Sequence, residues 1–316
     1  MVWPFIKLLP AKTNFRFVAF SKYAAILSII LAIGSVAMML TPFEGPCGGL
    51  NCGVDFKGGT VLDMNRGGKP IDLGALRDTL HDTEGLHDVQ VQGDGGQNLE
   101  AMIRFETPEG GNPAQQVEEI KSHLSGQFEG VQFTRTEVVG PKVSGELLTG
   151  GVMALFFAVL LMMVYIWFRF EWQFGVGAAL GLIHDVVLTF GLFALFQLEF
   201  TLTAVAAILT IIGYSMNDTV VVCDRLRENL RKYKKMPLGE VIDLSLNETL
   251  SRTIMTGITA VGALIGLAVL GGEALFGFSI ALIFGIIVGT YSSIYVAAPV
   301  ILIWGVNRSD ADAEIV

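Results

Sequence analysis

Asp218 is the residue whose surroundings most clearly predict chemistry, because it is the one charged residue in the apolar stretch 200–223. An ionisable side chain in hydrocarbon costs about 2.5 to 3.5 kcal/mol on insertion scales, so such a residue is expected to have a partner or a task. A carboxylate beside an arginine can change its proton occupancy when the arginine moves. We therefore take Asp218 as a candidate proton carrier.

Arg252 is the expected counterpart of Asp218, since it lies at a similar depth in the next apolar helix. An ion pair between the two is geometrically allowed. Each residue shares a helix face with other polar residues at helical spacing. These supporting residues are Thr210, Tyr214 and Asn217 near Asp218, and Glu248, Thr256 and Thr259 near Arg252. Two such stripes can hold a chain of water; the alternative is a static ion pair that locks the helices together.

A second ionisable pair, His184 and Asp185, lies in the middle of the apolar stretch 174–196. Asp185 could extend a proton relay, and a buried pair whose members satisfy each other is an equally good interpretation.

Other kinds of chemistry have little support in the composition. The chain has three cysteines and four histidines, too few and too scattered for a metal site, and no cofactor is expected. We find no nucleophile–base pair and no intramembrane-protease motif, so an enzyme is not expected. The formal charge of −9 argues against a nucleic-acid partner.

The elements that position these residues are transmembrane helices. Hydrophobic residues make up 52% of the chain and charged residues only 16%. A helix needs roughly 20 apolar residues to cross a bilayer. Six stretches qualify: 23–40, 150–168, 174–196, 200–223, 253–272 and 274–306. The sixth is too long for an upright span and is expected to tilt or break near Pro299.

Small residues recur every four positions along the sixth stretch, which allows another backbone to approach closely. They are Gly277, Ala281, Gly285, Gly289 and Ser293. We interpret this pattern as helix packing.

Lysine and arginine near the apolar stretches predict the orientation. They gather in the arm 1–22 and in the loop 224–252, so both ends of the chain, including the tail 307–316, are expected in the cytoplasm. The arm is either an interfacial amphipathic segment or a simple positively charged anchor. The first helix spans 23–41 and the remaining bundle 147–306, which places the segment 42–146 in the periplasm.

The segment 42–146 has the composition of a soluble domain. Beta-type runs at 60–64, 88–92, 99–105 and 131–139 alternate with helical patterns that begin at Asp72 and Asn112. The order beta-alpha-beta-beta-alpha-beta predicts an α+β, ferredoxin-like domain, and hence a membrane all-α bundle of six helices with this domain outside. Cys47 and Cys52 either form a local disulfide on this oxidising side or are two free thiols.

Four motifs together resemble the SecF family, the smaller subunit of the bacterial SecDF protein-export complex in the resistance-nodulation-division superfamily. They are GVDFKGGT at 53–60, GPKVSGEL at 140–147, GYSMNDTVVVCDRLREN at 213–229 and NETLSRTI at 247–254. The resemblance extends from the arm to the sixth helix.

The resemblance implies a function and partners. It implies a SecD partner beside the SecYEG channel and YajC, in an inner membrane, where the proton motive force helps to move unfolded secretory proteins. It implies a proton path through Asp218 and Arg252, at the SecD interface. The rival hypotheses are a proton-driven small-molecule efflux subunit and a structural subunit in which Asp218 and Arg252 form a static pair.

Overall fold

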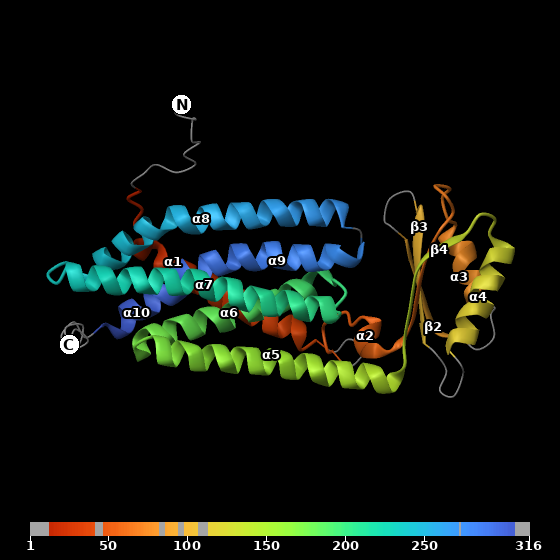
Figure 1. Cartoon of the computed structure of the whole chain (residues 1–316), viewed down its shortest axis with the longest axis horizontal. Coiled ribbons are helices and arrows are strands. Elements are labelled where there is room, and N and C mark those ends of the chain that lie inside the picture. Colours follow the sequence, from red (N-terminus) through yellow and green to blue (C-terminus); the bar gives the residue numbers. More distant parts are fainter. Residues whose placement is uncertain are drawn as a thin grey trace, which may run out of the picture. The chain divides into compact units, whose positions relative to one another are not determined.

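The computed structural model describes residues 13–41, 47–81, 86–93, 98–106, 113–271 and 273–306 (Figure 1). The chain divides into two compact units. The helical unit comprises Met1–Asn51 with Met153–Val316, and the sheet unit comprises Cys52–Val152. Most of the arm (1–12) and the whole tail (307–316) lie outside the described residues.

The sheet unit follows the predicted order of elements. It consists of α2 (Val54–Lys57), β1 (Gly59–Asn65), α3 (Leu73–His81), β2 (His87–Gly93), β3 (Glu100–Glu106), α4 (Pro113–Gln127) and β4 (Gln132–Val139). The strands form an antiparallel sheet in the order β2-β3-β1-β4, with Leu62 opposite Ile103 of β3 and Thr136 of β4. This topology confirms the ferredoxin-like prediction.

The core of the sheet unit lies between the sheet and its two longer helices. Both α3 and α4 lie over one face of the sheet (Figure 1). Leu76 of α3 and Leu124 of α4 are buried against Leu62 and Ile103 of the two central strands. Asp72 caps α3 as expected, because its Oδ1 accepts hydrogen bonds from the amides of Gly74 (2.9 Å) and Ala75 (3.1 Å).

The helical unit contains the residues with candidate chemistry. Its elements are α1 (Phe17–Met39), most of α5 (Pro141–Arg169), α6 (Trp172–Phe196), α7 (Leu202–Lys232), α8 (Leu238–Leu270), α9 (Glu273–Ser292), the π-helical turn η1 (Ser293–Ala297) and α10 (Ala298–Trp304). Within the described residues, six helical segments are long and apolar enough to cross a membrane. The predicted six-helix membrane bundle is thus confirmed.

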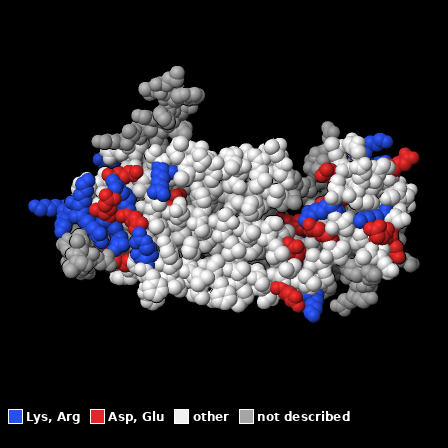
Figure 2. Space-filling view, in the orientation of Figure 1, with Lys and Arg blue, Asp and Glu red and all other residues white. Residues whose placement is uncertain are grey.

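Helices α6 and α7 form the centre of the helical unit. In each of these two helices, 56% of the residues in an apolar 18-residue stretch are buried. The corresponding share in α5 and in α8 is only 6%. Charged side chains gather at one end of this unit, where α7 ends and α8 begins, and the rest of the unit is mostly uncharged (Figure 2). We call this the basic end. Because so little of α5 and α8 is buried, these outer helices offer faces to lipid or to another protein.

The segment 224–252 differs from the expected loop. Helix α7 continues to Lys232 and α8 begins at Leu238, so only five residues, 233–237, connect them. Val241, Ile242 and Leu246 are buried on the first turns of α8. The helices continue past the apolar stretches because these turns still bury one amphipathic face.

The long sixth stretch breaks close to the predicted position. Pro299 lies in the first turn of α10, directly after the π-helical turn Ser293–Ala297. Proline has no amide hydrogen to donate, so the helix ladder is interrupted one turn before it. A π turn accommodates that interruption without ending the helix.

Cys47 and Cys52 are disulfide-bonded. The remaining cysteine of the three, Cys223, is free and buried in α7.

The glycine stripe of α9 supports a stability prediction. A Cβ atom at Gly285 would lie 2.4 Å from Cγ1 of Ile211 on α7, whereas a Cβ at Gly277 would meet no atom within 4 Å. We expect Gly285→Ala to lower the free energy of unfolding by about 1–3 kcal/mol, because branched Ile211 cannot move aside freely. Denaturant unfolding in detergent, with Gly277→Ala as the control, measures the effect. Equal stability of the two variants would contradict close packing at Gly285.

Candidate functional site

Asp218 lies in the interior of the helical unit. It is 4% exposed, on the face of α7 that packs against α9. Its Oδ2 accepts a long hydrogen bond, 3.5 Å, from the Thr290 hydroxyl of α9. A buried carboxylate with so weak a partner is poorly compensated. It is therefore well placed to change its charge.

Arg252 does not form the ion pair that the sequence allowed. No N···O contact within 4.0 Å joins it to Asp218 among the residues that the structure describes, although the two interact electrostatically. The Arg252 side chain is exposed on α8, a helix with little cover. The two charges are thus close enough to influence each other but are not locked together.

The threonine hydroxyls of the two supporting stripes donate to carbonyls of their own helices. The Thr210 hydroxyl donates to the Ala206 carbonyl (2.8 Å), and the Thr256 hydroxyl donates to Thr253 (2.9 Å) and Arg252 (3.1 Å) carbonyls. Thr210, Asn217, Thr256 and Thr259 are all exposed. Tyr214 is half-buried, and its hydroxyl has no hydrogen-bond partner of normal geometry within the described structure.

Among the described residues of the helical unit, Asp185 is the carboxylate with the most side-chain hydrogen-bond partners. It is fully buried, and its Oδ2 accepts hydrogen bonds from the hydroxyls of Ser215 on α7 (2.5 Å) and Ser292 on α9 (2.7 Å). Its Oδ1 lies 2.9 Å from Nδ1 of His184. The carboxylate therefore joins α6, α7 and α9. Sequence reasoning missed both serines, although Ser215 lies within the GYSMND motif.

His184 extends this cluster toward the first helix. Its ring stacks against Tyr291 with centroids 6.1 Å apart, and the Tyr291 hydroxyl donates to the Ala24 carbonyl of α1 (2.8 Å). The same hydroxyl lies 3.0 Å from the Ser28 hydroxyl, also on α1. Nε2 of His184 is buried without a hydrogen-bond partner in the part of the chain that is described.

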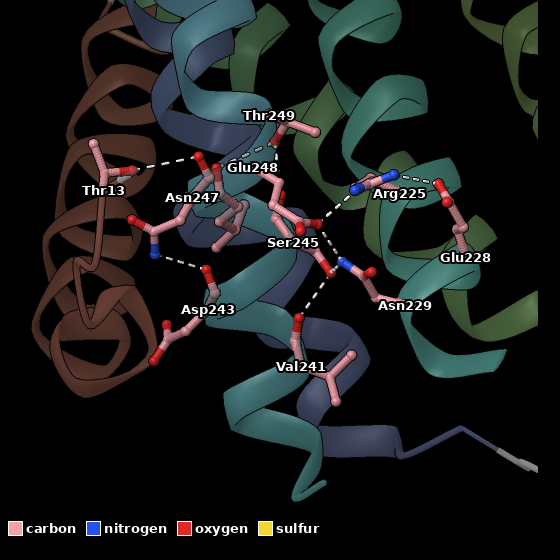
Figure 3. A network of polar contacts seen from close by, with 11 residues as sticks. Thr13, Arg225, Glu228, Asn229, Val241, Asp243, Ser245, Asn247, Glu248 and Thr249 are labelled. Atoms are coloured by element: carbon pink, nitrogen blue, oxygen red, sulfur yellow. Dashed lines mark hydrogen bonds and ion pairs between the residues drawn. The ribbon is translucent and has the colours of Figure 1, made fainter. Parts of the chain in front are cut away.

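Glu248 belongs to a different network from Arg252. Its Oε2 accepts hydrogen bonds from Nε of Arg225 and Nδ2 of Asn229, both at 2.7 Å, so it connects α8 to the end of α7 (Figure 3). Arg225 also pairs with Glu228. One helix turn separates Glu248 from Arg252, yet the packing of α7 against α8 directs Glu248 to the basic end.

The side chain of Asn247, on α8, holds the main chain of Phe15 just before the start of α1. Its Oδ1 accepts from the Phe15 amide and its Nδ2 donates to the Phe15 carbonyl, both at 2.9 Å. The Thr13 hydroxyl donates to the Asn247 carbonyl (3.3 Å), which Figure 3 shows beside the Glu248 network. Asp243 accepts from the Val18 amide at the first turn of α1 (2.9 Å). We call these contacts of Asn247 and Asp243 with residues 13–18 the Asn247 clasp. They join the described end of the arm to α8.

Comparison with known proteins decides the family. Residues 119–307 match the family model described as protein export membrane protein SecD/SecF, C-terminal. A protein of Rhodobacter capsulatus called protein translocase subunit SecF is 45% identical, over 96% of this chain and 93% of that protein. The chain belongs to the SecF family. The SecF proteins of Cereibacter sphaeroides and Rickettsia bellii are 44% and 42% identical, over 96% and 95% of the chain and 93% and 96% of their own lengths.

Solved SecDF structures resemble this SecF-family chain in fold. The crystal structure of SecDF from Thermus, titled a translocon-associated membrane protein, matches with a TM-score of 0.82 at 31% identity. The match covers 94% of this chain and 39% of the SecDF chain. A SecDF structure titled super-membrane-facing form gives a TM-score of 0.65 at 31% identity, over 100% of this chain and 42% of that one. The chain thus spans about two fifths of the SecDF chains that it matches.

Proposed function

We propose that this SecF-family chain works with a SecD partner to drive protein export with the proton motive force, and that Asp218 and Arg252 lie on the proton path. The partner pair would act beside the SecYEG channel and YajC, on unfolded secretory proteins. The membership of the family supports the export role. The geometry around Asp218 supports the proton path.

The observation that carries the proposal is a buried carboxylate that forms no ion pair with any residue the structure describes. Asp218 is 4% exposed and accepts a long hydrogen bond from Thr290, while the Arg252 charge lies nearby on an exposed face. Movement of Arg252 toward or away from Asp218 would stabilise or destabilise the carboxylate. One proton that crosses 100 mV releases about 2.3 kcal/mol, enough to bias a domain between two positions.

The exposed polar residues of α7 and α8 support a protein partner in the membrane. Thr210, Asn217 and Arg252 are exposed at membrane depth, where lipid would leave an arginine without compensation. A second bundle packed there would cover them. The solved SecDF chains are more than twice as long as this chain's match, which is consistent with a SecD portion that supplies such a bundle.

The proposed orientation places the basic end in the cytoplasm of a bacterium and the sheet unit in the periplasm. Arg225, Arg227, Arg231 and Lys232 at the basic end support it, because lysine and arginine are enriched in cytoplasmic segments.

Asn217 and Asp185 are the further residues that we assign to the path. Asn217 is the exposed neighbour of Asp218. Asp185 touches Ser215, one turn before Asp218 on α7, so a change of charge at Asp185 would act on the same helix. Thr210, Tyr214, Glu248 and Thr256 were expected to support the path. Of these, Tyr214 is the one whose buried hydroxyl could accept or donate to water there.

The rival hypotheses have less support. A structural subunit with a static pair would need Asp218 and Arg252 in contact, and the described residues contain no such ion pair. A small-molecule efflux subunit usually carries a much larger outer domain than the Cys52–Val152 unit.

Export into membrane vesicles that contain this chain and its SecD partner tests the proposal. We expect a secretory reporter to be exported faster with a proton gradient than after an ionophore dissipates it, and the gain to require this chain. A gain of the same size in vesicles without the chain would contradict the proposal.

A further inference from the structure

An open hollow of about 480 Å³ lies at the basic end of the helical unit. It is bounded by the end of α5 and by the last three turns of α7. Its lining residues are Arg169, Asp224, Arg227, Glu228, Arg231 and Lys232. Figure 2 shows lysine and arginine gathered over this end. Neither the proton path nor the family match gives this hollow a role.

The charges of the lining favour an anionic ligand. Four cationic side chains face two acidic ones. Both carboxylates already have cationic partners: Asp224 accepts two hydrogen bonds from Nη2 of Arg169 (2.6 and 2.7 Å), and Glu228 pairs with Arg225 from outside the lining. Glu171, also outside the lining, approaches Arg227 at 3.7 Å. The lining keeps a formal excess of positive charge, and guanidinium groups bind phosphate oxygens through paired hydrogen bonds.

The aromatic residues beside the hollow lie where lipid headgroups are expected. Trp167 and Phe168 directly precede Arg169 on α5 and are 83% and 88% exposed. Trp172, at the start of α6, is 60% exposed. Tryptophan is enriched at the membrane–water boundary, so Arg169 and the hollow are at headgroup level. The apolar surface of α5 leads away from this level and could hold acyl chains.

We propose that this hollow binds the phosphate headgroup of an anionic phospholipid. Arg227, Arg231 and Lys232 contact the phosphate, and Arg169, held by Asp224, closes the side toward α5. The exposed apolar surface next to Arg169 favours a lipid over a soluble phosphate, since a free anion would gain nothing from it. Such a lipid would fill the space between the ends of α5 and α7.

Native mass spectrometry of the purified full chain tests this proposal, because it counts lipids retained on each molecule. We expect one phosphatidylglycerol to be retained at concentrations at which phosphatidylcholine is lost. The variant Arg231→Gln/Lys232→Gln should weaken retention roughly 30-fold, as expected for two basic residues near an anionic surface. The control Lys234→Gln/Lys235→Gln removes the same charge from the adjacent turn, outside the lining, and should change retention less than about threefold.

Three results would overturn the proposal. The first is equal retention of phosphatidylcholine and phosphatidylglycerol, and the second is an equal loss in the two double variants. The third is full displacement of the lipid by inorganic phosphate together with saturable binding of phosphate alone, which would assign the hollow to a soluble anion. The measurement involves no export, so a failure here is separate from a failure of the proton path.

Discussion

Replacement of Asp218 by asparagine is expected to reduce export with a proton gradient to the rate seen without one, while the complex with SecD assembles normally. Asparagine has nearly the same size and can still accept the hydrogen bond from Thr290, so packing against α9 should persist. It cannot exchange a proton, however, and the coupling between gradient and movement should be lost. The vesicle assay with and without ionophore measures this, and co-purification with SecD reports assembly.

A control variant separates this effect from a general loss of charge. Glu240→Gln removes one carboxylate from the first turn of α8, at an exposed position outside both the proposed path and the lining of the hollow, and should leave gradient-dependent export intact. The double variant Asp218→Arg/Arg252→Asp adds a second check, since a static pair would tolerate the exchange and a relay would not. Full gradient-dependent export by Asp218→Asn would remove Asp218 from the path.

The second large effect is expected at Asp185. Asp185→Ala should lower the free energy of unfolding by about 3 kcal/mol or more, because it removes the buried carboxylate that Ser215, Ser292 and His184 contact. Denaturant unfolding of the full chain in detergent measures the loss. Ser279→Ala is the matched control, since the Ser279 hydroxyl is buried but donates only to the Leu275 carbonyl of its own helix.

The asparagine variant tests the chemical role of the same residue. Asp185→Asn keeps an acceptor for one serine and should recover part of the stability that the alanine variant loses. If Asp185 takes part in proton transfer, this variant should still lose gradient-dependent export. A stable Asp185→Asn variant with normal gradient-dependent export would limit Asp185 to the connection of α6, α7 and α9. A stability loss in Asp185→Ala no larger than in Ser279→Ala would contradict the connection itself.

Much of the fold could be predicted because apolar length and strand alternation depend on local sequence. The six spans and the four strands follow from such patterns. The contact between Asn229 of α7 and Ser245 of α8 could not, because helical spacing does not say which polar residues of two helices meet. That contact depends on three-dimensional packing.

Some residues of the candidate site could likewise be predicted from local sequence, and others could not. Asp218 and Asp185 were visible because a carboxylate in an apolar stretch is exceptional. Ser215 and Ser292 were not, since serine is common in transmembrane helices and usually bonds to its own backbone. The partner of Glu248 was also missed: helical spacing aligned it with Arg252, but it contacts Arg225 of another helix.

The Asn247 clasp joins residues far apart in the sequence, so it forms late during synthesis of the chain. Phe15 emerges from the ribosome 232 residues before the asparagine that holds its amide and carbonyl. At about 5–20 residues per second, that interval is roughly 10 to 50 seconds. The first helix therefore enters the membrane with its starting turn unsecured, and its attachment to α8 waits until most of the bundle has been synthesised.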